Sequence, residues 1–196
     1  MTNQIHLPIS AIQKMASLAV FAEAKGYTPA LAGVNISVGT DRITAVASDR
    51  YVLASFGYSG NFGMAEMSEP DYLSFSQTTC KALLAIKRGR HDIDACLITY
   101  GGGVFTVEYQ GITYKAEPLA DLAPKFEQMI SYFDKPLEDS FSGFNLNPSH
   151  LAKLVKISKN NWRFDRFTSG TSNQKLAPVL ATCDGFNVII QPTLTK

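Results

Sequence analysis

Apolar residues follow two different spacings along this chain. In three segments they recur every three or four residues, which is typical of one face of a helix. We expect the first helix from Pro8 to Lys25, the second from Ser76 to Gly89, and the third to begin at Asn147-Pro148. Pro8 suits a first helical position, and serine and asparagine are favoured N-caps. The pattern therefore predicts three helices with recognisable starts.

Between the helices the apolar residues alternate with polar or small ones, which indicates antiparallel strands. The alternation covers 34–56, with turns at Gly39–Arg42 and Asp49-Arg50. A second run, 96–114, turns at Gly101–Gly103, and a third, 179–190, turns at Asp184-Gly185. The three glycines lack the lysine and the strand-to-helix context of a phosphate loop, so a hairpin turn is the better interpretation.

The elements repeat as a strand, a helix and a run of antiparallel strands, starting near Gln4, Tyr72 and Phe141. Such internal repetition decides the architecture. It predicts an α+β fold of strand–helix–antiparallel-strand units. We expect two units in 1–130, a linker at 131–140 and a third unit in 141–196.

Charge is segregated in a chain whose net charge is only +1. Residues 80–91 and 148–166 are rich in lysine and arginine, whereas 117–139 is acidic. A neutral chain arranged in this way can still present one basic surface.

Other features of the composition exclude several classes of protein. No apolar run approaches the ~20 residues needed to span a bilayer. The first residues do not resemble a signal peptide, so we expect a cytoplasmic location. Cys80, Cys96 and Cys183 lack metal-site spacing and are expected to be reduced, buried thiols. His6, His91 and His150 are isolated, and no nucleophile–base pair is visible.

Residues 47–54 read Ala-Ser-Asp-Arg-Tyr-Val-Leu-Ala, and residues 182–194 run from Thr182 through Asp184-Gly185 to Leu194. Both segments resemble the bacterial DNA polymerase III beta sliding clamp family. Residues 47–54 are similar to its Ala-Thr-Asp-Gly-x-Arg-Leu motif, and 182–194 to its closing strand and Met-Pro-x-x-Leu-like tail. Arg50 replaces the family glycine, Val52 the arginine and Gln191 the methionine. The chain is shorter than the bacterial protein, which indicates a compact version from a phage or mobile element.

The resemblance implies the repeated clamp (processivity) fold and a non-enzymatic ring of identical subunits, a trimer or a tetramer, that needs no cofactor. Its expected partners are double-stranded DNA, bound without sequence preference, a DNA polymerase and a clamp loader. In this family the helices line the DNA channel, where basic side chains neutralise phosphates. The expected DNA-binding residues are Lys14, Lys81, Lys87, Arg88, Arg90, Lys153, Lys156 and Lys159. Lys153 and Lys156 are expected to share a helix face opposite Leu151 and Leu154.

The resemblance also implies a groove for partner peptides, whose apolar pocket would take a leucine or phenylalanine side chain. The matching positions are Ser48, Leu53, Ile189, Ile190, Gln191, Pro192 and Leu194. Ring contacts are expected at strand edges, such as the Tyr100–Tyr114 hairpin or the strand near Phe141.

Two other functions fit the same patterns. A phage structural or assembly protein could use the same oligomeric edges without tethering anything to DNA. An enzyme acting on DNA would need a carboxylate cluster and a metal ion, which a nuclease assay with magnesium would test.

Overall fold

The computed structural model describes residues 2–23, 28–60, 71–87, 94–119, 122–138, 145–168 and 177–192. The helices are α1 (Ile9–Ser17), α2 (Gln77–Ala85), α3 (Leu122–Ser131) and α4 (Pro148–Ile157), with short 3-10 turns at Leu18–Phe21, Pro29–Leu31 and Tyr132–Asp134. The strands are β1 (Asn3–Pro8), β2 (Gly33–Val38), β3 (Arg42–Ser48), β4 (Val52–Ser59), β5 (Asp71–Ser76), β6 (Ala95–Gly101), β7 (Val104–Tyr109), β8 (Ile112–Pro118), β9 (Arg163–Arg166), β10 (Val179–Cys183) and β11 (Phe186–Ile190).

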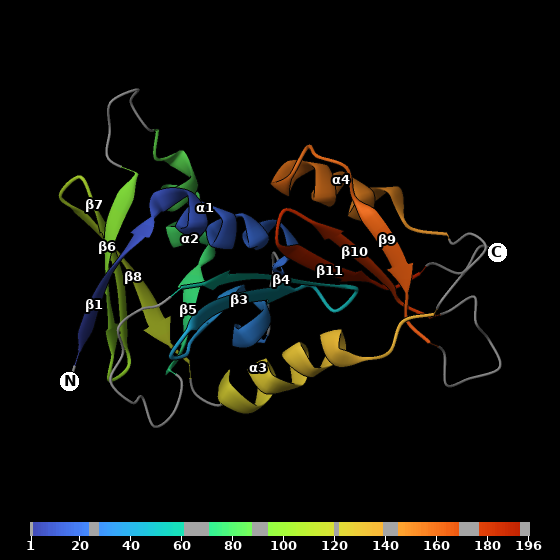
Figure 1. The fold of residues 1–196 in the computed structure, drawn as a ribbon, viewed down its shortest axis with the longest axis horizontal. Coiled ribbons are helices and arrows are strands. Elements are labelled where there is room, and N and C mark those ends of the chain that lie inside the picture. The colour runs from blue at the N-terminus through green and yellow to red at the C-terminus, as the bar shows by residue number, and fades with distance from the viewer. Residues whose placement is uncertain are drawn as a thin grey trace.

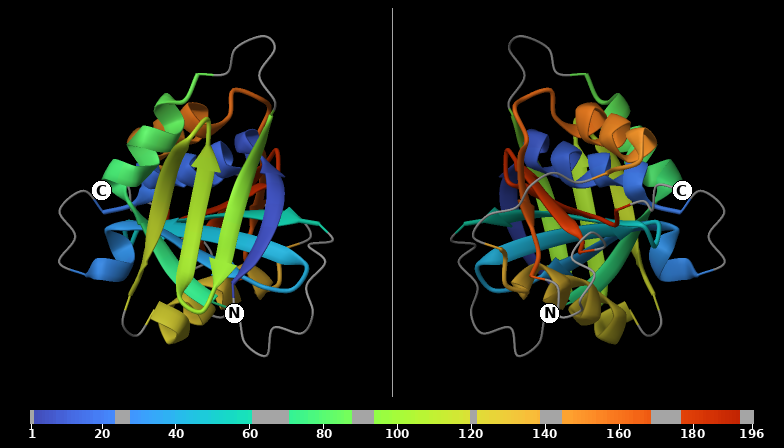
Figure 2. Two further views of the ribbon diagram at one scale, coloured as in Figure 1. Left: turned by 90° about the vertical axis from the view of Figure 1, so that its left-hand side faces the viewer. Right: turned by 90° about the vertical axis from the view of Figure 1, so that its right-hand side faces the viewer.

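All of these strands belong to one antiparallel sheet, ordered β1-β6-β7-β8-β5-β2-β3-β4-β11-β10-β9. The first two predicted units exchange strands, because β1 pairs with β6 and β5 pairs with β2. Figure 2 shows β1, β6, β7 and β8 side by side as one face of the molecule. The last strand, β11, pairs with β4, so Ile189 lies opposite Leu53 although the two are far apart in sequence.

Helices α1, α2 and α4 lie together on one side of the molecule, whereas α3 lies across β3 and β4 from them (Figure 1). The main core is on the side of the three helices and contains Met15, Phe21, Phe75 and Phe105. A smaller apolar cluster, which includes Phe167 and Ile189, forms on the other face of β4 and β11. Around β3 and β4 the sheet is therefore covered on both faces, by different helices.

The predicted hairpins are confirmed, including the turn at Gly101–Gly103, where all three glycines have positive φ. Two of the predicted helix starts are also confirmed. The Ser76 hydroxyl accepts a hydrogen bond from Thr79 N at 3.0 Å, and Asn147 Oδ1 accepts one from Ser149 N at 2.9 Å. These contacts satisfy backbone donors that a helix cannot satisfy itself.

Two features of the first helix were predicted wrongly. It begins at Ile9, and Pro8 is the extended residue before it, with ψ at 131°. It ends at Ser17 and continues as a 3-10 turn to Phe21, well before Lys25. Neither α3 nor β9 was predicted. The second helix also ends earlier than predicted, at Ala85 and before Gly89, because Ile86 is already extended. The expected strand near Phe141 lies outside the described residues.

Candidate functional site

A hollow of about 270 Å³ opens where the β3–β4 turn meets β11 and the end of α3. The turn contributes Ser48, Arg50, Tyr51, Val52 and Leu53. Helix α3 contributes Met129, and the 3-10 turn after it contributes Tyr132. The segment around β10 and β11 contributes Pro178, Ile189 and Gln191. Side chains from three separate parts of the chain thus form one concave surface with a mainly apolar lining.

Hydrogen bonds inside the β3–β4 turn fix its shape. The Ser48 hydroxyl donates to the Val52 carbonyl at 2.9 Å and accepts from Arg50 N at 3.2 Å. Asp49 Oδ1 accepts from Tyr51 N at 3.1 Å and from Val52 N at 2.8 Å. Arg50 takes the left-handed conformation, with φ at 76°. Glycine, which has no Cβ atom, adopts that conformation freely. This gives a physical reason for the glycine at the matching position of the clamp family motif.

Helix α4 holds the turn from the side of the three helices. Lys153 Nζ lies 2.5 Å from Asp49 Oδ2, and both side chains are largely buried, at 24% and 16% exposed. The rings of His150 and Tyr51 stack with their centroids 6.5 Å apart. The Asp49 carboxylate therefore bonds to α4 through one oxygen and to the turn through the other.

Four of the predicted groove residues, Ser48, Leu53, Ile189 and Gln191, line this hollow. Ile190 does not: it is fully buried in the main core, because successive side chains of a strand point to opposite faces. Pro192 is buried and Leu194 lies outside the described residues.

Met129 and Tyr132 were not predicted as groove residues, because residues 117–139 were interpreted only by their acidic charge. The helix there has a signal of its own, since Leu122, Phe126, Met129 and Ile130 follow the spacing of one helix face. Phe126 packs edge-on against the ring of Tyr72, with ring centroids 5.4 Å apart, which places α3 on β5.

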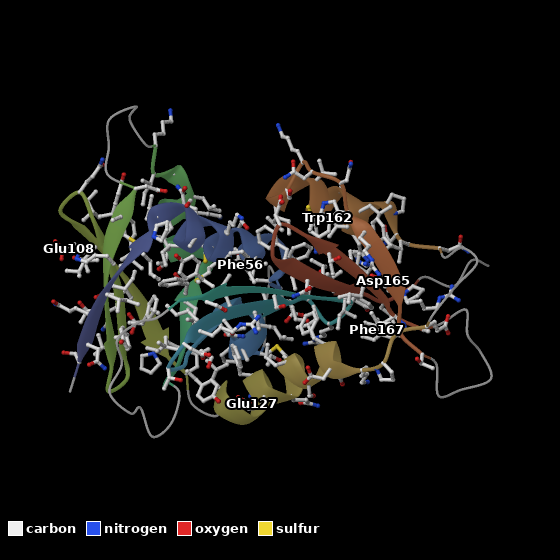
Figure 3. All side chains as sticks on the ribbon, in the orientation of Figure 1. Phe56, Glu108, Glu127, Trp162, Asp165 and Phe167 are labelled. Atoms are coloured by element: carbon white, nitrogen blue, oxygen red, sulfur yellow. The ribbon has the colours of Figure 1, made fainter. Side chains whose placement is uncertain are left out.

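Four of the predicted DNA-binding lysines, Lys81, Lys87, Lys156 and Lys159, are exposed. In the part of the chain that the structure describes, none of the four forms an ion pair. Helices α1, α2 and α4 contain no aspartate or glutamate, whereas α3, on the other side, contains Glu127 (Figure 3). Exposed lysines therefore lie on the side of the molecule formed by α1, α2 and α4, and these three helices contain no acidic residue.

The predicted faces of α4 were wrong. Lys153 points into the protein, to Asp49 and to within 5.9 Å of the Phe21 ring centre. Leu154 is buried, but Leu151 and Val155 are exposed, so the apolar stripe is narrower than the sequence indicated. Arg88 and Arg90 lie outside the described residues.

Lys14 is exposed but has partners within the protein. Its ammonium donates to the Asp184 carbonyl at 3.3 Å and lies 5.5 Å from the centre of the Phe56 ring. Phe56 lies beneath α1, and Trp162 lies beneath α4 (Figure 3). Lys14 thus stabilises the packing between α1 and the β10–β11 turn, independently of any contact with DNA.

The Asp184 carboxylate ties that turn to the end of α4. Its Oδ2 accepts hydrogen bonds from Ser158 Oγ at 2.6 Å and from Asn160 Nδ2 at 2.7 Å. These bonds, that of Ser158 above all, lower the pKa of Asp184 below its ordinary value because they favour the charged form.

The three cysteines are free and buried, as predicted. Burial raises the pKa of Cys80 to about 12 and that of Cys96 to about 11, which makes both thiols poor nucleophiles at neutral pH. Across the described ranges, no three His, Cys, Asp or Glu side chains gather in a way that could hold a metal ion. In the same residues, no helix is long and apolar enough to span a membrane.

Comparison with solved structures identifies the fold as that of the bacterial sliding clamps. The DNA polymerase III beta chain of Streptococcus pneumoniae matches 98% of this chain with a TM-score of 0.66 at 14% identity. The DNA polymerase sliding clamp of Pseudomonas aeruginosa matches 98% with a TM-score of 0.67 at 12% identity. The beta subunit of Streptococcus pyogenes DNA polymerase matches 98% with a TM-score of 0.68 at 15% identity.

The predicted resemblance to the beta clamp family and the predicted fold class are therefore confirmed at the level of the fold. The chain spans about two thirds of each clamp chain, since the three matches cover 65%, 66% and 66% of them. No protein-family model matches the sequence, and no curated protein matches it.

Proposed function

We propose that this chain is the subunit of a sliding clamp. Identical subunits would close a ring around double-stranded DNA and tether a DNA polymerase to it, with no catalytic chemistry and no cofactor of their own. A separate loader would open the ring, and the assembly would act in the cytoplasm. The observation that carries this proposal is the hollow beside the β3–β4 turn, because it is lined by residues that the clamp-like motifs predicted from two distant segments.

The groove has the properties that an extended peptide needs. Its apolar lining, Val52, Leu53, Met129 and Ile189 among others, can take a leucine or phenylalanine side chain. The Ser48 hydroxyl and the Asp49 carboxylate are occupied within the turn, which keeps the turn rigid before a partner binds. A preformed pocket lowers the ordering cost of binding.

The DNA-facing surface is proposed on α1, α2 and α4. Exposed lysines on and just after these helices can neutralise phosphates, and flexible ammonium groups do so without reading bases. Such contacts hold the duplex while allowing it to slide. A structural or assembly role in a phage would use the same fold without needing three helices that carry lysines and no acidic residues.

The DNA surface is tested by replacing Lys81 and Lys156 together with glutamate. In the control variant, Lys115 and Lys125 are replaced with glutamate instead. Both are exposed, and neither lies on those three helices. Affinity for a 30-base-pair duplex is measured by anisotropy at several salt concentrations. We expect the first pair to weaken binding and to lower the salt slope by roughly 0.9 for each phosphate that the protein no longer neutralises. Equal behaviour of the two double variants would refute this surface.

The groove is tested with a fluorescent peptide, Gly-Ser-Asn-Leu-Phe-Gly-Ser. Replacing Tyr132 with alanine, or Met129 with glutamine, should weaken its binding by roughly tenfold, because each removes part of the apolar lining. Gln128→Ala on the exposed face of α3 is the matched control and should bind normally. Binding that is insensitive to both lining substitutions would mean that the peptide binds elsewhere.

A further inference from the structure

Arg50 occupies a position that its backbone disfavours. A residue with a Cβ atom in the left-handed region costs roughly 1 kcal/mol or more, and arginine lacks the short polar side chain that makes asparagine tolerable there. The Arg50 side chain forms an ion pair with Glu23, in which Nη2 lies 3.5 Å from Oε1. The arginine side chain is 56% exposed. Exposed pairs of that kind contribute little to stability. Strained residues that folding does not explain are concentrated at ligand sites.

The guanidinium of Arg50 stands at the edge of the groove. It lines the hollow, and its planar fork has five N–H donors, of which the Glu23 contact can use only a part. A second cation contacts a residue of the lining, because Lys135 Nζ lies 4.4 Å from the centre of the Tyr132 ring. The two acids of the turn region already have partners, since Glu23 faces Arg50 and Asp49 faces Lys153.

We infer that Arg50 is a specificity-determining residue that selects partner peptides carrying an acidic side chain next to their apolar anchor. The inference rests on the proposed groove and adds the chemistry of its ligand. The apolar anchor fills the space between Leu53, Met129 and Ile189, and the neighbouring carboxylate accepts hydrogen bonds from the free edge of the guanidinium. Arg50 contacts Glu23 and the peptide together.

The test compares two labelled peptides, Gly-Ser-Asp-Leu-Phe-Gly-Ser and its counterpart with asparagine in place of aspartate. The wild-type chain should bind the aspartate peptide roughly fivefold more tightly, and the difference should shrink as salt is raised. Arg50→Gly relieves the backbone strain, so this variant should fold at least as stably as the wild type and bind both peptides equally. Arg163→Gln, which removes an exposed arginine on β9, should keep the wild-type preference.

Each result has a distinct meaning. A preference that disappears in Arg50→Gly and persists in Arg163→Gln supports the inference. Equal binding of the two peptides to the wild type, or a preference that survives in Arg50→Gly, overturns it and leaves the groove standing. If neither peptide binds the wild type, the proposed groove fails and the inference fails with it.

Discussion

At the scale of single residues, Asp49 links the groove to the side of the three helices. One carboxylate oxygen accepts from two backbone N–H groups of the β3–β4 turn, and the other meets Lys153 of α4. Both side chains are largely buried, so removing either leaves a polar group that water reaches poorly. Lys153, which the sequence predicted to bind DNA, therefore supports the β3–β4 turn.

Substitutions at this pair should have unequal effects. Asp49→Ala should lower the free energy of unfolding by about 2–4 kcal/mol, because it leaves two backbone donors and a lysine without their acceptor. Lys153→Met should cost less, about 1–2 kcal/mol, because the carboxylate keeps its backbone bonds. Urea unfolding measures both, and Lys156→Met, an exposed neighbour on α4, should change stability by less than about 0.5 kcal/mol. A cost for Lys156→Met equal to that of Lys153→Met would contradict this role for Lys153.

The sequence predicted Ser48, Leu53 and Ile189 as neighbours because short motifs carry the turn and the closing strand. It could not separate Ile190 from Ile189, since the motif marks a segment and the pleat of β11 decides which side chain faces the groove. Lys153 was misplaced for a similar reason. A short helix with few apolar residues allows more than one buried face, and contacts with other elements select one.

At the scale of elements, the β10–β11 turn and the end of α4 form one unit through Asp184. Ser158 and Asn160 donate to its carboxylate, and Lys14 of α1 donates to its carbonyl. The turn was predicted from Asp184-Gly185, but this connection was not, because it joins residues that only the folded chain brings together. Helix α3 was missed although its apolar spacing was present, which shows that charge composition alone is a poor guide to an element.

The Asp184 contacts predict a pH dependence of stability. The pKa of this carboxyl is lowered in the folded chain, so its contribution is present above its ordinary pKa of 3.8 and is lost as pH falls further. Asp184→Asn is a suitable comparison, because asparagine also tolerates the positive φ of 52° found here. The melting temperature of the wild type should exceed that of the variant near neutral pH, and the difference should narrow below about pH 4. A constant difference across that range would show that the charge of Asp184 is unimportant.

At the scale of the whole molecule, the repeated units explain how one sheet can carry helices on one side and a groove on the other. The first two units exchange strands, and the third joins them by pairing β11 with β4. Period-two and helical spacings predicted most of this fold, because hairpins and amphipathic helices are local features. The order of strands in the sheet is a tertiary property and came from the structure.

The division into 1–130, a linker at 131–140 and 141–196 stays a prediction. In the structure the linker region begins with the end of α3 and a 3-10 turn, and Leu137 pairs with Phe167 after β9. These contacts connect that region to the third unit. Ring closure also stays a proposal, and it makes the assembly state the central question.

The most direct test of the clamp account is the mass of the assembly in solution, measured by light scattering across a range of concentrations. The chain weighs 21.4 kDa. The account predicts a stable species of three or four times that mass, as a closed ring of identical subunits requires. A strict monomer at every concentration would contradict it, since a chain with the clamp fold but no ring cannot encircle DNA.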